Sequence, residues 1–188
     1  MKILILTDVF FPDTTGGAGR VVYYLCLELS KRGHEVHVFT RNPNKELPFF
    51  EKFKNGFFIH RFVLSENESL CLIYKEAKNS YSLAKKITNE TTFDCVCIHQ
   101  SMAAIGPLLS SSLRDIPIIY YFHSPWHEEY LIKKVTEDNK VNLKDRIIST
   151  IMKMVERRIL NRSKKVIVLS NYMREKVLQI HGYPQGNN

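Results

Sequence analysis

The sequence predicts a doubly wound α/β fold, in which a mostly parallel β-sheet is flanked by helices. The first observation is that short apolar runs alternate with segments of helical periodicity along all 188 residues. The second is a tight strand–helix–strand unit over residues 3–40, which requires a parallel pair of strands and a right-handed crossover. The third is that no repeat, linker or low-complexity tract interrupts the alternation. We therefore expect one domain that covers residues 1–188.

The first half of the chain begins with a strand and a helix of clear boundaries. Residues 3–7 form a continuous apolar run, which is typical of a strand buried on both faces. The next helix begins at Gly17 and ends at Lys31-Arg32-Gly33, where basic residues precede a glycine cap. The other predicted segments are a strand at 35–40, a polar and turn-rich stretch at 43–55, a strand at 57–62 and a helix at 70–88 with Leu72, Leu83, Ala84 and Ile87 facing inward.

The second half of the chain continues the alternation and contains one long amphipathic helix. The predicted segments are a strand at 95–99, helices at 103–113 and 143–160, strands at 116–122 and 166–169, and a helix from Asn171 to about residue 180. In the long helix an apolar stripe is expected to face inward, and the other face is basic. The stripe comprises Leu143, Ile147, Ile151, Val155 and Ile159 with Ile148 and Met152 beside them, and the basic residues are Lys144, Arg146, Lys153, Arg157 and Arg158.

Composition indicates a globular protein without a membrane span. Hydrophobic residues make up 44% of the chain, and no apolar run approaches the roughly 20 residues that a membrane-spanning helix needs. The N-terminal residues lack the features of a signal peptide, so we expect a cytoplasmic protein. The cysteines lack the spacing of a zinc site or redox pair and are expected to be buried thiols. They are Cys26, Cys71, Cys95 and Cys97.

The net charge of +8 favours anionic partners. Phosphates, anionic lipid headgroups and nucleic acid would all satisfy that charge. The aromatic residues do not interleave with the basic ones and no RNA-binding or helix-turn-helix pattern is present, which argues against nucleic acid. The basic face of the helix at 143–160 is expected to be either solvated or docked to an anionic membrane or acceptor, with Phe49-Phe50 able to add an apolar contact.

The glycines at the start of the first helix form a candidate phosphate cradle. Ligands of doubly wound sheets bind outside the carboxyl ends of the strands, which selects residues 8–19, 99–101, 123–127 and Ser170. Within the first range, Gly16 and Gly17 leave backbone N–H groups open to an anion at the positive end of the helix dipole.

Two familiar nucleotide-binding patterns are absent from this turn. The dinucleotide fingerprint needs Gly-x-Gly-x-x-Gly directly after the first strand, but Gly17-Ala18-Gly19 follows a long insertion and Val22 replaces the third glycine. Thr40-Arg41 occupy the place of the acidic residue that would bind a ribose. The Gly-x-x-x-x-Gly-Lys-Ser/Thr phosphate loop is absent as well. Both patterns are therefore excluded by the residues themselves.

Histidines end two of the predicted strands, His99 at one and His123 at the other. At the carboxyl end of such a strand an imidazole points toward the ligand crevice, where it can donate, accept or, when protonated, face a phosphate. One histidine in this position is more often structural. Two at equivalent strand ends, together with a glycine turn at a third, favour a functional role.

Several motifs occur in the order and spacing found in family 4 glycosyltransferases, which have the GT-B fold. They are Met1-Lys2-Ile3-Leu4 with Phe11-Pro12, Gly16-Gly17, Leu29-x-x-Arg32-Gly33-His34-Glu35-Val36, the Phe93-Asp94 strand ending in His99, the Ile116-Pro117 strand ending in Phe122-His123, and Glu156-x-x-x-Leu160 leading to residues 165–173. Each motif alone is weak, but together they span nearly the whole chain. The sequence therefore resembles the Rossmann-like N-terminal, acceptor-side domain of these enzymes.

The resemblance implies retaining transfer of a sugar from a nucleotide-sugar to a carbohydrate or lipid-linked acceptor. It implies that Gly16 and Gly17 approach the donor phosphate or the transferred sugar, and that His123 is the catalytic-centre residue that hydrogen-bonds the sugar. Acceptor-side or cleft positions are expected for His99, Ser124, Trp126, Arg20 and Ser170. Neither a metal nor another cofactor is expected.

The resemblance also implies a C-terminal nucleotide-sugar-binding domain that residues 1–188 do not contain. In the family this domain supplies the basic residues that hold the diphosphate and the acidic pair that holds the donor sugar and ribose. We therefore expect the isolated chain to lack most donor affinity and to be inactive on its own. The alternative is a non-catalytic module that binds a carbohydrate or phospho-ligand, or a partner-dependent subunit.

Overall fold

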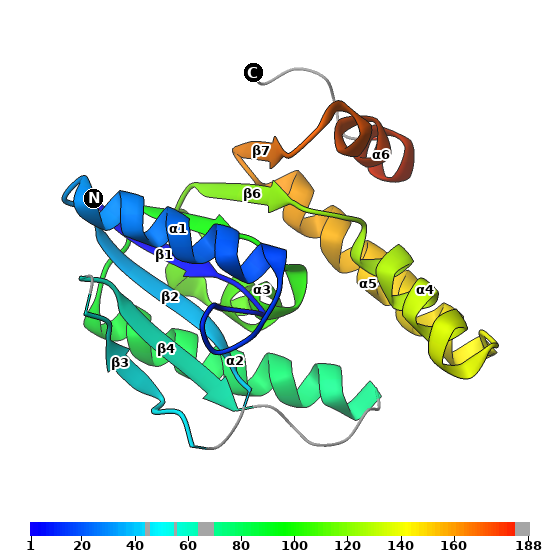
Figure 1. Ribbon diagram of the computed structural model, residues 1–188, viewed down its shortest axis with the longest axis horizontal. Helices are drawn as coiled ribbons and strands as arrows, with labels where there is room; N and C mark the ends of the chain where they lie inside the picture. Colours follow the sequence, from blue (N-terminus) through cyan, green and yellow to red (C-terminus); the bar gives the residue numbers. More distant parts are fainter. Residues whose placement is uncertain (44–45, 55, 64–69, 183–188) are drawn as a thin grey trace. The chain divides into compact units, whose positions relative to one another are not determined.

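The computed structural model describes residues 1–43, 46–54, 56–63 and 70–182. It divides the chain into two compact units, Met1–Ile119 and Tyr120–Asn188, which are described separately below. Both units are built from alternating strands and helices (Figure 1). The α/β class predicted from the sequence is confirmed.

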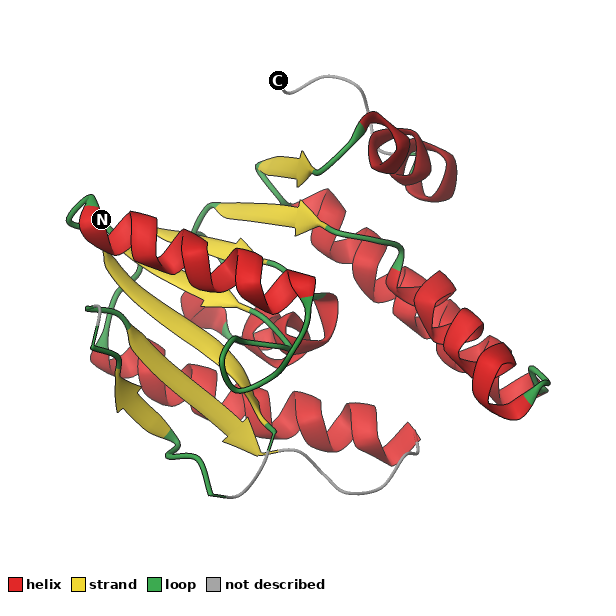
Figure 2. Ribbon diagram, viewed as in Figure 1, coloured by secondary structure: helices red, strands yellow, loops and turns green. Residues whose placement is uncertain are grey.

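The first unit contains a sheet with helices on both faces. Its elements are β1 (Lys2–Leu6), α1 (Gly17–Lys31), β2 (Glu35–Asn42), β3 (Phe50–Lys52), β4 (Phe58–Val63), α2 (Leu70–Glu90), β5 (Cys95–Ile98), α3 (Ser101–Leu109), the short 3₁₀ helix η1 (Ser111–Leu113) and the start of β6 (Ile118–Phe122). Figure 2 shows α1 on the near face of the sheet and α2 and α3 on the far face. The helices therefore flank the sheet as predicted.

The strands of the first unit follow the order β3-β4-β2-β1-β5, with the start of β6 beyond β5. β1 pairs in parallel with β2 on one side and with β5 on the other, and β2 pairs in parallel with β4. Only the short β3 runs antiparallel to its neighbour β4 among these pairs. The chain thus leaves β1 in one direction toward β2 and later in the other toward β5. This reversal of strand order makes the β1–β5 edge the switch point at which ligands bind in such sheets.

The core of the first unit lies on the central strands. β1, β2 and β5 are almost continuously buried, because parallel strands covered on both faces have no side that meets water. Val22 and Cys26 of α1 and Ala84 and Ile87 of α2 are buried against this core. Cys95 and Cys97 are buried as expected, whereas the side chains of Cys71 and Leu72 lie outside the described part.

The second unit combines the end of β6 with a helical hairpin, a strand and a final helix. These are α4 (Trp126–Asp138), α5 (Leu143–Arg162), β7 (Lys165–Val168), which neighbours β6, and α6 (Asn171–His181). Asn139 ends α4 in the left-handed conformation, which asparagine tolerates well. Asn142 and Asp145 then form a capping box that starts α5. The hairpin between the two helices is therefore fixed by local sequence.

Three details of the sequence prediction need correction. The helix expected at 103–113 is α3 followed by η1, because Ser110 takes an extended conformation that ends α3 at Leu109. The stretch at 43–55 contains the edge strand β3, and α4 was not predicted at all. α4 begins after Pro125 without a capping side chain, so its sequence lacks the usual start signal.

The inward face predicted for α5 is partly wrong. Leu143 is 75% exposed and Ile159 only 1%, although both belong to the stripe of residues four apart. Each step of four residues turns about 40° around the helix, so the stripe drifts from the solvent face to the buried face along the helix. Ile148, Met152 and Ile159 are buried as predicted, and the buried face is completed by Asp145, Ser149, Glu156 and Leu160.

Candidate functional site

The carboxyl ends of β1 and β5 lie side by side in the first unit. Leu6 pairs with Ile98, and the N–H of His99 donates to the Leu6 carbonyl over 2.9 Å. The loop that follows β1 and the segment that follows β5 therefore leave the sheet together. The structure thus brings two of the ranges selected from the sequence, 8–19 and 99–101, to one switch point.

Gln100 joins these two segments. Its side-chain oxygen accepts the N–H of Asp8 over 2.7 Å and lies 2.6 Å from the Thr7 hydroxyl. The range 99–101 was selected from the sequence, but this role for Gln100 was not. A contact between residues 92 positions apart has no periodic signature in a sequence.

The glycine turn at the start of α1 is open. Gly16 has φ +143°, a conformation that favours glycine, and it caps α1 without any side-chain hydrogen bond. A Cβ placed on Gly16 or Gly17 would meet no atom of the described residues within 4 Å. The first turn of α1 therefore has no capping side chain, and its glycines have no Cβ atoms that would keep a ligand away from the backbone. This is the arrangement that binds an anion at a helix N-terminus.

Asp13 anchors the loop that carries the glycine turn. Its carboxylate accepts two hydrogen bonds from the Arg61 guanidinium of β4, at 2.6 and 3.1 Å, and Glu51 of β3 accepts a third at 2.9 Å. Arg61 is only 2% exposed. Burial alone would lower the pKa of Arg61, but the two carboxylates raise it above its ordinary value. The buried charge is thus compensated by the loop itself.

Asp8 places a buried carboxyl group at the same edge. Burial raises the pKa of Asp8, while Arg41, whose Nε lies 3.5 Å away, and the N–H groups of Met102 and Ala103 act in the opposite direction. Those two N–H groups belong to the first turn of α3, so the carboxyl sits at a helix N-terminus. The sequence selected Asp8 only as one member of a range.

The other predicted residues of the first unit lie in different surroundings. The His99 side chain is 1% exposed, so it belongs to the interior and does not present its ring on an open surface. Arg20 is exposed, and its guanidinium lies 5.5 Å from the centre of the Phe11 ring. Phe11 is part of the loop after β1, and this loop ends at the glycine turn. Arg20 therefore lies beside this loop.

The turn between β6 and α4 carries three predicted residues of the second unit. His123 is half-buried, and burial lowers its pKa while the charge of Glu129 acts to raise it. The Ser124 hydroxyl donates to the Glu129 carboxylate. Trp126 is half-buried at the start of α4. Ser170 lies elsewhere in this unit and caps α6 by accepting the N–H of Met173 over 3.2 Å, which gives it a structural role.

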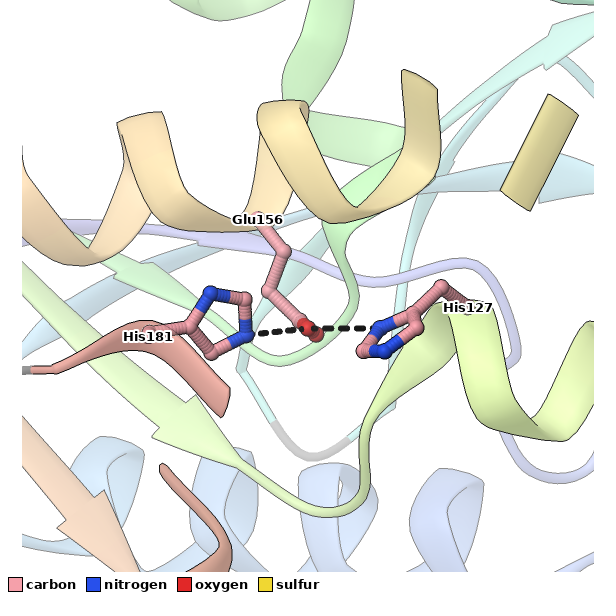
Figure 3. A group of neighbouring side chains, drawn as sticks. All are labelled: His127, Glu156 and His181. Carbon is pink, nitrogen blue, oxygen red and sulfur yellow. Dashed lines mark hydrogen bonds and ion pairs between the residues drawn. The ribbon is translucent and has the colours of Figure 1, made fainter. Parts of the chain in front are cut away.

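A buried carboxylate with two histidines lies behind this turn (Figure 3). Glu156 accepts a hydrogen bond from His181 Nε2 over 2.9 Å, and His127 Nδ1 lies 3.7 Å from the same oxygen. Burial acts to raise the pKa of Glu156, but the histidine interactions outweigh it and the pKa lies below the ordinary value. The ligand atoms of these three residues all lie within 4.8 Å of one another, a spacing that could accommodate a metal ion.

Residues 15–187 match the family model described as Glycosyltransferase Family 4. The chain belongs to glycosyltransferase family 4. The resemblance drawn from the motifs is thereby confirmed, and family membership supports a transferase. A search of curated proteins found no match.

Solved structures show the same fold as this family 4 chain. Sucrose-phosphate synthase from Thermosynechococcus elongatus superposes with a TM-score of 0.73 at 16% identity, over 95% of this chain and 44% of that one. A second structure under the same enzyme name gives a TM-score of 0.60 at 13% identity, over 100% of this chain and 85% of that one. The Rossmann-like GT-B fold predicted from the sequence is confirmed. The family 4 chain thus spans less than half the length of the first of these proteins.

Within the part that the structure describes, no helix of this family 4 chain combines the length and apolar character needed to cross a bilayer.

Proposed function

We propose that this chain is the acceptor-binding N-terminal half of a retaining glycosyltransferase that transfers a sugar from a nucleotide-sugar to an acceptor. The observation that carries the proposal is the open glycine turn, found at the switch point of a sheet in a family 4 chain. Free N–H groups at a helix start favour a phosphate, and the diphosphate of a nucleotide-sugar is the group that leaves with developing negative charge.

In this proposal the glycine turn and His123 have different tasks. The N–H groups around Gly16 and Gly17 stabilise the charge on the leaving diphosphate or hold the transferred sugar. His123 fixes the sugar through a hydrogen bond, and the lowered pKa favours its neutral form, which can both donate and accept. Neither task requires a metal or another cofactor.

The remaining residues are assigned to the acceptor side. Ser124 and Trp126 follow His123 in the same turn, and Arg20 lies in the first turns of α1 next to the glycines. His99 is buried, and Ser170 caps α6, so both residues are assigned a supporting role. The acceptor in this proposal is a carbohydrate or a lipid-linked carbohydrate, and nucleic acid is not a partner.

The donor is proposed to need a C-terminal domain as a partner. The chain covers 44% of the length of sucrose-phosphate synthase, which leaves room for a second domain in a complete enzyme. In the proposal the isolated chain holds the acceptor side and does not turn over. The alternative of a carbohydrate or phospho-ligand binding module shares the glycine turn but needs no reacting centre.

The test is replacement of His123 by Ala in the full-length protein, assayed with a panel of nucleotide-sugars for release of the nucleoside diphosphate. We expect turnover to fall by about 100-fold or more, since the residue positions the reacting sugar. Thermal unfolding should be nearly unchanged, because the side chain is half-buried. Turnover that survives the substitution would remove His123 from the reacting centre. Absence of turnover in the parent protein would favour the binding-module alternative.

A second proposal concerns the solvent face of α5 in the second unit. Its centre carries Leu143, 75% exposed, and Met154, 65% exposed, with the exposed Ile147 between them. Basic side chains flank this line on both sides: Lys144 and Arg158 on one, Arg146, Lys153 and Arg157 on the other. An exposed apolar stripe between basic rows is typical of a helix that lies in an anionic membrane interface. We propose peripheral contact of this face with an anionic membrane.

A further inference from the structure

Glu156 is buried at a place where the proposed reaction does not use its charge. The side chain is 0% exposed, in the middle of α5 and behind the β6–α4 turn (Figure 3). One oxygen accepts the Tyr120 hydroxyl over 3.2 Å and the Trp126 N–H over 3.3 Å. The other accepts His181 Nε2 over 2.9 Å. Both oxygens are therefore occupied by donors from the protein.

The burial of the Glu156 carboxylate has a free-energy cost that requires a physical explanation. Burying a charge is costly, and an apolar side chain of similar size would often give a more stable interior. Such a group is kept where its hydrogen bonds specify one arrangement of the chain around it. The segments that donate hydrogen bonds to Glu156 therefore indicate which part of the chain it holds in place.

The donors to Glu156 bracket the turn that carries His123. Tyr120 lies in β6 three residues before His123, and Trp126 is the first residue of α4, three residues after it. Because the same carboxylate oxygen holds both, the distance between the end of β6 and the start of α4 is fixed. His181 adds the last turn of α6 to the same point.

His127 closes the cluster on the α4 side. It is 9% exposed, and its Nδ1, which lies 3.7 Å from the carboxylate, makes no hydrogen bond to any of the described residues. Its ring stands nearly perpendicular to that of His181, with centres 6.1 Å apart. The two imidazoles thus lie on opposite sides of the Glu156 carboxylate (Figure 3).

We propose that Glu156 is a positioning residue that holds the β6–α4 turn, and with it His123, in one geometry. The effect of Glu156 on catalysis rests on the proposed function, whereas its effect on the geometry of the turn does not. Glu156 itself does not touch the substrate. Its carboxylate acts through the Tyr120 hydroxyl and the Trp126 N–H.

The test compares three variants of the full-length protein by hydrogen exchange and kinetics. Glu156→Leu removes both acceptors, and Glu156→Gln keeps one oxygen that can accept from Tyr120 and Trp126. The control is Thr150→Ala, an exposed residue of the same helix whose hydroxyl bonds, among the described residues, only the Arg146 carbonyl. Exchange of the amides of residues 123, 124, 126 and 127 should rise by at least about tenfold in the Leu variant, as expected for the loss of the buried hydrogen bonds that hold the turn. The Gln variant should restore most of the protection, and Thr150→Ala should change nothing.

Kinetics separate a positioning role from general stability. With a nucleotide-sugar that the parent protein turns over, the Leu variant should lose kcat by at least about tenfold, with KM within about twofold. An exchange increase spread evenly over the second unit, or none at 123–127, would overturn the inference. So would one equivalent of bound metal, measured by atomic absorption in the parent protein and lost in the Leu variant. Because the exchange data need no substrate, they decide the positioning of the turn even if the proposed transfer fails.

Discussion

Replacing Asp13 by Ala tests whether the loop of the glycine turn is anchored to the sheet by a buried ion pair. The substitution removes two of the hydrogen bonds of Arg61 and leaves those to Glu51 and the Pro48 carbonyl. The guanidinium is almost completely buried and cannot exchange the lost partner for water. The loop before Gly16 should therefore loosen while the sheet persists.

The expected loss of stability is about 3 kcal/mol. Removing one partner of a buried pair costs roughly 3–5 kcal/mol, because the other charge remains in the interior. The lower end applies since Glu51, which is partly exposed, still compensates Arg61. Replacing Asp13 by Ala and Arg61 by Met together should cost less than the sum of the two single losses, because no unpaired charge is left behind.

The assay is urea unfolding followed by circular dichroism, combined with hydrogen exchange of the loop residues 8–16. Glu51→Ala is the matched control, because it removes the more exposed partner of the same guanidinium. It should cost about 1 kcal/mol or less. Equal losses for Asp13→Ala and Glu51→Ala, or an Asp13→Ala variant with unchanged exchange in the loop, would refute the anchoring role.

His60 in β4 and the solvent face of α5 are open to direct tests. Burial, with the charges of His37 and Lys86, lowers the pKa of His60 to about 4, so the unfolded state takes up its proton first as the pH falls. The neutral side chain of His60 makes its full contribution to the free energy of unfolding above about pH 6.5, and about 3 kcal/mol of it is lost by pH 4. The free energy of unfolding, measured with urea at several pH values, should fall over this range, and His60→Gln should remove this pH dependence. On α5, Leu143→Ser combined with Met154→Ser should abolish salt-sensitive co-sedimentation with vesicles of anionic phospholipid, whereas equal binding to neutral vesicles would contradict the membrane proposal.

The regular parts of the fold could be predicted because their signals are local. Buried parallel strands such as residues 3–7 are continuous apolar runs, and Gly33 and the capping box before α5 mark helix ends within a few residues. The glycine turn was also visible, since Gly16 and Gly17 directly precede a helical pattern. The sequence therefore indicated the class of fold and the glycine start of α1.

The features that were not predicted from the sequence depend on contacts between residues far apart in the chain. In the sequence Arg61 looks like a surface residue of its strand. In the structure it is paired with Asp13, which lies 48 positions away. The same holds for Gln100 against Asp8 and for Glu156 against His181. The face of α5 was misjudged for another reason. The buried row, Ile148, Met152, Glu156 and Leu160, lies one position beyond the predicted stripe, and Glu156 makes this row look polar in the sequence. Periodicity alone cannot reveal which polar groups the fold will bury.

The central claim, that the glycine turn binds the donor phosphate, is tested most directly by Gly17→Val in the full-length protein. Gly17 has free space where a Cβ would stand and no positive φ, so the larger side chain should fill the anion site without disturbing the fold. The measurement is nucleotide-sugar affinity by isothermal titration calorimetry, with Thr15→Val as the neighbouring control. We predict at least a tenfold weaker affinity for Gly17→Val and no change for Thr15→Val. Equal affinity in both variants and the parent protein would contradict the account.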